Sequence, residues 1–483
     1  MQRQVVQRIL GMLLGGFSLA MLPPVAITMI YPGETIMPFV VSALITLVCA
    51  LVLWYPVRNS RDDLHLRDGF LIVVLFWTVL GTFGALPLLL SSELQLGITD
   101  AVFESISGLT TTGATVITNL DELPRSVLFY RQTLQWLGGM GLIVLAVAIL
   151  PLLGVGGMQL YRAETPGPVK DARLTPRIKE TAKALWYIYL SLTAVCAFSY
   201  WLAGMNAFDA ISHSFSTVAI GGFSTHNANI GHFQSAPIEA VSILFMLLAG
   251  ANFGLHFITW KSLSLRHYLQ DAEFKTYLSV LFAITLIAVI FLRFSGVYPY
   301  WDDAFAKAIF HAVSIGTTTG YTTTQFHLWP GFLPLLLLLV SFIGGCAGST
   351  GGGLKVIRVL LLVKQGLREL LRLIHPSAKI AVKIGSKPVE RRVIEAVWGF
   401  FSAYIAVFVF MLLLLIASGL DEVTAFSAVT ATLNNLGPGL GDVGSNYTGI
   451  NNFSKWVLCL GMLLGRLEIF TLLVVLTPAF WRR

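Results

Sequence analysis

Four times along the chain, a short polar stretch that ends in glycine follows an apolar, helix-like run. Each stretch is flanked by segments long and apolar enough to cross a membrane. Inside a bilayer, non-helical backbone is tolerated only where it is buried in protein or lines a water-filled cavity. Rings of backbone carbonyls that replace an ion's hydration shell form the filters of cation pores. We therefore expect a pseudo-fourfold pore built from Thr110–Gly113, Ala219–Gly222, Thr317–Gly320 and Asn434–Gly437.

The composition supports an all-α integral membrane protein. Hydrophobic residues make up 55% of the 483 residues, charged residues make up 12%, and the mean hydropathy is +0.76. A soluble domain carries roughly 25% charged residues. A membrane helix needs roughly 20 apolar residues. The segments that reach or approach this length are 8–30, 37–55, 70–92, 130–153, 183–204, 237–260, 276–294, 332–363, 394–418 and 454–480.

The positive charges predict the orientation. Of the 32 Lys and Arg residues, 22 lie in the loops 56–69, 160–183, 261–275 and 355–392, and four more lie near the two ends of the chain. The segment 204–237 contains no Lys or Arg. The positive-inside rule then places the basic loops and both termini in the cytoplasm, and the four polar stretches towards the outside. Because the net charge of +7 reflects this loop bias, we do not interpret it as nucleic-acid binding.

A short apolar run precedes each polar stretch and is too short to span, so it predicts a re-entrant pore helix. These runs are 103–109, 212–218, 309–316 and 425–433, and at matching positions they contain Glu104, His213, His311 and Ala428. Acidic residues precede each run and are expected to cap it, so the negative helix ends would point to the pore centre and favour a cation. The acidic residues are Asp100, Asp209, Asp302, Asp303, Asp421 and Glu422.

Glycine also interrupts the second helix of each repeat. The final glycine of each polar stretch meets the need for unusual backbone angles at little steric cost. Some 24–28 residues later come breaks at 138–141, 250–254, 344–353 and 461–465. The third break is the most glycine-rich, so we expect unwound backbone below the filter that acts as a movable barrier. A phosphate-binding loop is the alternative for Gly348–Lys355, but the Walker spacing and a preceding strand are missing.

One arginine, Arg466, lies in the apolar interior of the last span and is therefore a candidate functional residue. Its partner is expected to be Glu468 or the carbonyls of the glycine-rich stretch, although an arginine that only fixes helix packing is the simpler interpretation. We interpret Lys355 and Arg358 as side chains that reach to the membrane surface. The four cysteines lie in apolar stretches without metal-ligand spacing and are expected to be free thiols.

The motifs GGCAGSTGGGLKVIR (344–358), LNNLGPGLG (433–441) and GRLEIFTLL (465–473) resemble the TrkH/KtrB/HKT superfamily of K⁺ transporters over essentially the whole chain. The resemblance implies four helix–pore-loop–helix repeats preceded by two extra helices, a homodimer in the bacterial inner membrane, and a cytosolic TrkA-like ring that binds the nucleotide. It implies a gating loop stabilised by Arg466, and Gly113 favours K⁺ over Na⁺. The implied gate is Gly344, Gly345, Cys346, Ala347, Gly348, Ser349, Thr350, Gly351, Gly352 and Gly353. The implied K⁺ contacts are Thr111, Thr112, Ile220, Gly221, Thr318, Thr319, Asn435 and Leu436, with Gly113, Gly222, Gly320 and Gly437 beside them.

We therefore expect a K⁺ pore with no cofactor and no catalytic residues, divided into 1–60, 61–165, 166–265, 266–385 and 386–483. The first segment is the pair of extra helices and the others are the four repeats. An H⁺- or Na⁺-coupled symporter on the same architecture is the first alternative, although no strongly buried acidic relay is evident. A membrane enzyme, such as a lipid-modifying transferase, is the second, but it needs clustered His, Asp or Glu, and the nine histidines are scattered.

Overall fold

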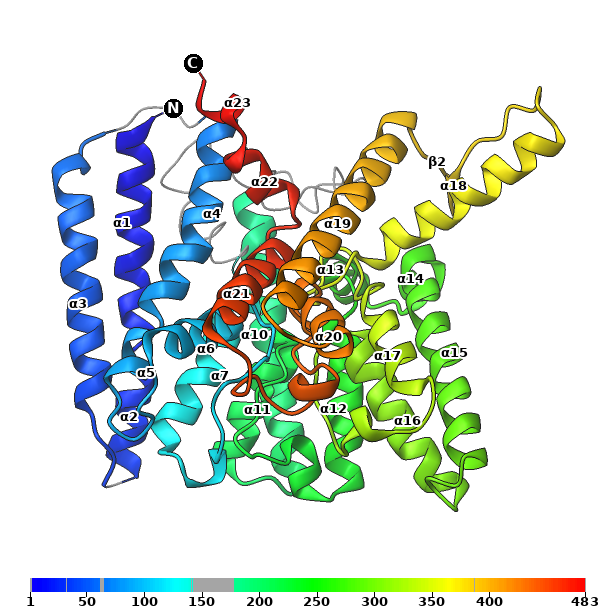
Figure 1. Ribbon diagram of the computed structural model, residues 1–483. Coiled ribbons are helices and arrows are strands. Elements are labelled where there is room, and N and C mark those ends of the chain that lie inside the picture. The colour runs from blue at the N-terminus through cyan, green and yellow to red at the C-terminus, as the bar shows by residue number, and fades with distance from the viewer. Residues whose placement is uncertain are drawn as a thin grey trace.

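In a computed structural model the protein is a bundle of helices (Figure 1), and the structure describes residues 2–31, 33–60, 65–139, 141, 178–385 and 387–482. Within these residues, six helical segments are long and apolar enough to cross a membrane, or up to eight if each of two bent helix pairs is counted as one span. The six are Arg3–Ile30, Met37–Val57, Arg67–Leu90, Lys183–Leu202, Ala272–Phe294 and Arg391–Ala417. The all-α membrane architecture is confirmed.

The helices repeat one pattern four times, after two extra helical arms at the N-terminal end. Each repeat has an outer helix, a short pore helix and a second helix, and in repeats 2, 3 and 4 the second helix is interrupted or bent. The N-terminal arms are α1 (Arg3–Leu19), α2 (Pro23–Ile30) and α3 (Met37–Trp54). The outer helices are α4 (Leu66–Phe83), α10 (Ile178–Leu202), α15 (Ala272–Phe294) and α19 (Arg391–Ala417). The pore helices are α6 (Ile98–Leu109), α11 (Ala207–Ala219), α16 (Trp301–Gly316) and α20 (Glu422–Leu433).

The second helices begin with α7 (Arg125–Gly139), α12 (Ala236–Ala249), α17 (Leu333–Ser341) and α21 (Asn452–Arg466). Those of repeats 2, 3 and 4 resume as α13 (Phe253–Ser262), α18 (Val356–Ile374) and α22 (Phe470–Leu476). The remaining helices are short: α5 (Leu86–Leu90), α14 (Arg266–Gln270), α23 (Pro478–Trp481), η1 (Tyr55–Val57), η2 (Leu120–Glu122), η4 (Asn229–Phe233), η5 (Phe326–Leu328) and η6 (Gly441–Val443). One antiparallel strand pair follows α18, in which β1 (Lys383–Ile384) pairs with β2 (Lys387–Pro388).

Buried apolar side chains form a core around the places where the pore helices end. The largest cluster joins the N-terminal arms to repeats 1 and 4 and includes Phe39, Trp77, Leu109 and Leu433. Both ends of the described chain lie on one side of the bundle, at the top of Figure 1. On the same side α18 projects away from the other helices, so its long amphipathic surface is only partly covered.

Three of the ten expected spans are broken within the described residues. Two of them bend: 237–260 by 95° between α12 and α13, and 454–480 by 115° between α21 and α22. The expected span 332–363 is interrupted between α17 and α18, because its glycine-rich centre does not hold a helix. The expected span 130–153 begins as α7, but residues 142–153 lie outside the described residues. So do Met140, in the expected break at 138–141, and residues 160–177 of the basic loop 160–183. The four cysteines are free, as expected.

Candidate ion pore

The four glycine-ended stretches adopt the same backbone conformation directly after the four pore helices. The second residue of each has a left-handed φ: 55° at Thr111, 55° at Ile220, 67° at Thr318 and 52° at Asn435. The final glycines follow with φ values of 81°, 78°, 82° and 97°. A left-handed φ is strained for a β-branched residue, so it persists only where the surroundings impose it. Four equal turns at matching positions therefore identify one repeated, imposed geometry.

The four turns form a closed ring. A Cβ atom added at the final glycine of each turn would lie under 3.0 Å from a carbonyl oxygen of the next turn. The pairs run from repeat 1 to 2, 2 to 3, 3 to 4 and 4 back to 1. They are Gly113 with Gly221, Gly222 with Thr319, Gly320 with Leu436, and Gly437 with Thr112. This close cyclic packing explains why each turn ends in glycine, because any side chain at these positions would clash with a carbonyl oxygen of the neighbouring repeat.

One hydrogen bond recurs in all four repeats and ties each turn to its pore helix. The amide of the residue before the final glycine donates to a carbonyl in the last turn of the helix. The four bonds are 2.7–2.9 Å long and join Thr112 to Ser107, Gly221 to Ser216, Thr319 to Ser314, and Leu436 to Ala431. Ser107, Ser216, Ser314 and Ala431 each lie six residues before the final glycine of their turn, and they share a backbone role that does not require a hydroxyl group.

Two side chains that the sequence reasoning missed, Gln135 and Arg131, pack around the ring. Gln135 of α7 donates to the Gly221 carbonyl oxygen at 2.5 Å and accepts from the Phe223 amide at 3.1 Å. It fills space next to Gly221, where the equivalent residues of repeats 1 and 3 are threonines. The glycine at position 221, where repeats 1 and 3 have threonine, indicated that another side chain fills this space. Nothing in the sequence indicated that this side chain is Gln135.

Glu104 and Arg131 form a buried ion pair beside the ring, with exposed fractions of 0% and 1%. The Glu104 carboxylate also accepts from the Val116 amide at 2.9 Å and from the Thr115 hydroxyl at 3.0 Å. In repeat 2 the matching His213 bonds Ser224 at 2.9 Å, two residues beyond Gly222, as Thr115 is two residues beyond Gly113. Glu104 is thus a buried carboxylate, but it is paired with Arg131 and is not by itself the acidic relay that a coupled symporter would need.

The acidic residues at the starts of the pore helices have different roles. Asp421 caps α20, since its carboxylate accepts from the Thr424 amide at 3.0 Å. Asn206, not Asp209, caps α11. The Asp209 carboxylate instead accepts from Thr225 and His226, and Asp100 pairs with Lys455 at 2.7 Å. The capping interpretation therefore holds for Asp421 and is wrong for Asp100 and Asp209, because nearby donors from other segments compete for their oxygens.

The stretch 344–353 is not helical and contacts the ends of three pore helices. The Thr350 hydroxyl donates to the Val218 carbonyl oxygen at 3.0 Å. The Gly352 amide donates to the Thr318 hydroxyl at 2.7 Å, and the Gly353 amide donates to the Asn434 carbonyl at 3.1 Å. We call this segment the glycine loop. It contacts the ring on the side from which α18 begins.

Charged side chains hold the glycine loop from two sides. One carboxylate oxygen of Glu273, at the start of α15, accepts from the Ala347 amide at 2.6 Å and the Ile357 amide at 3.2 Å. Arg466 donates to the Thr350 carbonyl at 3.1 Å and to the Gly138 carbonyl at the end of α7. Of the two partners expected for Arg466, the loop carbonyls are thus present. The loop is therefore linked to repeats 1, 3 and 4 by charge-assisted hydrogen bonds.

Two expectations near the glycine loop were wrong. Arg358 does not reach to the membrane surface; it is 6% exposed and pairs with Glu468, and its guanidinium lies 4.3 Å from the centre of the Phe400 ring. Similarly, Lys355 turns back to bond the Gly351 carbonyl. The fourth helix break is also not at 461–465, because α21 continues to Arg466 and bends by 115° before α22. Gly465 instead permits close contact with the Leu433 carbonyl.

Comparisons with known proteins agree with this geometry. Residues 35–482 match the family TrkH, described as a cation transport protein. The chain belongs to the TrkH family. It is 57% identical to Trk system potassium uptake protein TrkH of Vibrio parahaemolyticus and 55% identical to the protein of that name of Escherichia coli strain K12, over 100% of each chain. A crystal structure of the potassium transporter TrkH from Vibrio parahaemolyticus superposes with a TM-score of 0.91 at 55% identity, covering 100% of both chains.

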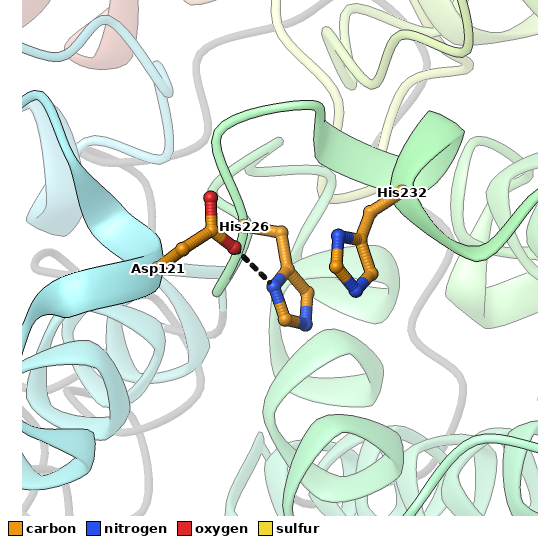
Figure 2. A group of neighbouring side chains, drawn as sticks. All are labelled: Asp121, His226 and His232. Atoms are coloured by element: carbon orange, nitrogen blue, oxygen red, sulfur yellow. Dashed lines mark hydrogen bonds and ion pairs between the residues drawn. The ribbon is translucent and has the colours of Figure 1, made fainter.

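The fold also brings together three side chains that come from two distant segments of the sequence and were not expected to form a group. Asp121, His226 and His232 lie together where the loops that follow the turns of repeats 1 and 2 meet (Figure 2). His226 Nδ1 is 2.6 Å from Asp121, and its Nε2 is 3.2 Å from Asp209. Burial opposes the charge on this ring, but the hydrogen bonds to Asp209 and Asp121 raise the pKa of His226 above its ordinary value.

Proposed function

We propose that this TrkH-family chain is a potassium-uptake pore of the bacterial inner membrane, in which the four-turn ring is the filter. The closed ring of equal turns carries the proposal, because backbone carbonyls held at fixed positions can replace the hydration shell of K⁺. The filter consists of the stretches 111–113, 220–222, 318–320 and 435–437. The names of the relatives, Trk system potassium uptake proteins, support K⁺ as the transported ion.

The proposed orientation places both termini and α18 in the cytoplasm. The basic loops support it through the positive-inside rule, and both ends of the described chain lie on the side of α18. Ions then enter at the loops that follow the turns, pass the filter and meet the glycine loop. In this account the repeats extend over 61–165, 166–265, 266–385 and 386–483, after the extra helices in 1–60, and the chain works as a homodimer.

The glycine loop is the proposed gate. Its contacts to Val218, Thr318 and Asn434 keep it against the inner side of the filter, and Arg466 and Glu273 hold it there. Because the loop is unwound and rich in glycine, it can change conformation without unfolding a helix. Opening requires the loss of these hydrogen bonds, so a mechanical pull on α18, which follows the loop directly, can move it.

A cytosolic nucleotide-binding ring is the proposed regulator, and the surface between α18 and α19 is its proposed docking site. A concavity of about 620 Å³ lies there with an excess of basic residues; its charged lining residues are Arg368, Arg372, Lys379, Arg391, Glu369 and Glu395, and Trp398 also lines it. Charge on a rim of this kind steers an oppositely charged partner. Docking at this site would connect movement of the regulator to the glycine loop through α18.

Purified protein in liposomes tests the proposal. With K⁺ inside and radioactive Rb⁺ outside, we expect Rb⁺ to accumulate without any H⁺ or Na⁺ gradient, whereas protein-free liposomes accumulate none. Accumulation that occurs only when an inward H⁺ or Na⁺ gradient is imposed supports the coupled symporter instead. The buried carboxylates do not favour coupling, because Glu104 is paired with Arg131 and Glu273 bonds two backbone amides. Absence of Rb⁺ accumulation in all conditions contradicts both.

A further inference from the structure

The cluster of Asp121, His226 and His232 combines ligand types that suit a transition metal. One ligand atom from each side chain lies within 4.8 Å of the others. In a tetrahedral zinc site, bonds of 2.0–2.2 Å place neighbouring ligand atoms about 3.3 Å apart. Small side-chain movements therefore suffice to bring the three atoms to one ion. Two imidazoles and a carboxylate suit Zn²⁺ and similar ions rather than K⁺ or Mg²⁺.

The His226 ring is already oriented as metal-binding histidines are. Its Nε2 faces the Asp209 carboxylate at 3.2 Å, and its Nδ1 faces Asp121 at 2.6 Å. Metal-ligating histidines commonly donate their other ring N–H to a carboxylate, which fixes the ring. Asp209 is itself held by Asn206 at 2.6 Å and Thr225 at 2.7 Å. A metal ion can therefore replace the proton that His226 Nδ1 shares with Asp121.

His232 supplies a second, exposed imidazole. Its ring lies parallel to that of His226 with centroids 3.6 Å apart, as Figure 2 shows. It forms no hydrogen bond within the described residues. Because His232 is exposed, its ring can turn so that both imidazoles aim at one ion. The Asp121 carboxylate is positioned too, since the Asn227 side chain donates to its second oxygen at 3.0 Å.

We propose that Asp121, His226 and His232 bind one divalent transition-metal ion of the Zn²⁺ class, with Asp209 orienting His226. The ion would join η2 of repeat 1 to the loop of repeat 2. That loop continues from the filter turn, and Asn229, three residues after His226, donates to the Gly222 carbonyl at 3.2 Å. A bound metal would therefore restrain the mouth of the ring on the side away from the termini.

Zinc titration of the purified full-length protein, with any affinity tag removed, tests the proposal. We expect about one Zn²⁺ per chain and a higher midpoint of thermal unfolding in the presence of Zn²⁺. His232→Ala should weaken binding more than about a hundredfold, because loss of a ligand exceeds the roughly 10–100-fold effect of losing an orienting partner. Asp209→Asn should show that smaller effect. His232→Ala is suitable because no hydrogen bond within the described residues depends on its ring.

His375→Ala is the matched control, since His375 is an exposed histidine at the end of α18, away from the cluster. It should bind Zn²⁺ and be stabilised as the unmodified protein is. Asp121→Asn should repeat the loss seen with His232→Ala. Equal zinc affinity and equal stabilisation in the unmodified protein, His232→Ala and Asp121→Asn would overturn the assignment, as would loss of binding in His375→Ala alone. No outcome depends on whether the pore conducts K⁺.

Discussion

Replacing Arg466 by alanine should open the proposed gate. The Arg466 guanidinium links the glycine loop to repeat 1 by donating to the Thr350 and Gly138 carbonyls, and it lies 5.3 Å from the centre of the Trp77 ring. A hydrogen bond to a charged group contributes about 1.5–3 kcal/mol. If the bond to the loop exists only in the closed state, its loss raises the ratio of open to closed protein about ten- to a hundredfold.

The assay is Rb⁺ flux through liposomes that contain the purified variant without any regulator. We expect Arg466→Ala to raise basal flux by that factor, up to the limit set by a fully open pore. Arg466→Lys, which keeps the charge but not the two-pronged geometry, should fall between it and the unmodified protein. Deleting part of 347–352 should also raise flux. Flux at or below the unmodified level, from variants that remain monodisperse and stable, would refute the gating role.

Three further predictions concern the filter, its support and the regulator. Gly113→Ser should lower the ratio of Rb⁺ to Na⁺ uptake in cells that lack other K⁺ transporters, because its side chain meets a neighbouring carbonyl at a φ of 81°; an unchanged ratio counts against the filter. Glu104→Ala should destabilise the protein by about 3–5 kcal/mol in thermal unfolding, since it leaves a buried arginine unpaired, and a shift similar to that of a surface Glu→Ala variant would contradict this. The triple charge reversal Arg368→Glu, Arg372→Glu and Lys379→Glu in the concavity beside α18 should weaken co-purification with the regulator. Normal binding and a normal nucleotide response in this variant would reject that docking site.

The repeated features of the fold were predictable from the sequence. The pore helices, the turns and the glycine loop are each encoded by a continuous segment, and four copies of the pattern reinforced one another. The pore helices extend further than expected at their N-terminal ends, because the acidic residues belong to the first turn or the cap of each helix. Local composition and the need for glycine at left-handed backbone positions were sufficient to predict the pore helices, the turns and the glycine loop.

The side chains that hold the turns and the loop were not predictable, because their partners are far apart in the sequence. Glu273 bonds residues 74 and 84 positions away, and Arg358 pairs with a carboxylate 110 positions away. The tendency of charged side chains to reach to the membrane surface predicted an outward Arg358, but the partly buried Glu468 pairs with it inside the bundle. The proposed metal ligands Asp121, His226 and His232 were likewise not predictable as a group, because only the fold brings η2 close to the segment 226–232.

The reversal potential under bi-ionic conditions, with K⁺ on one side of a planar bilayer and Na⁺ on the other, tests the filter most directly. If the four-turn ring selects K⁺ through its carbonyls, the potential should lie towards the K⁺ equilibrium value and should stay there when the pH of one side changes. In Gly113→Ser it should move towards zero. A potential near zero for the unmodified protein, or one that follows the pH difference, would contradict the account.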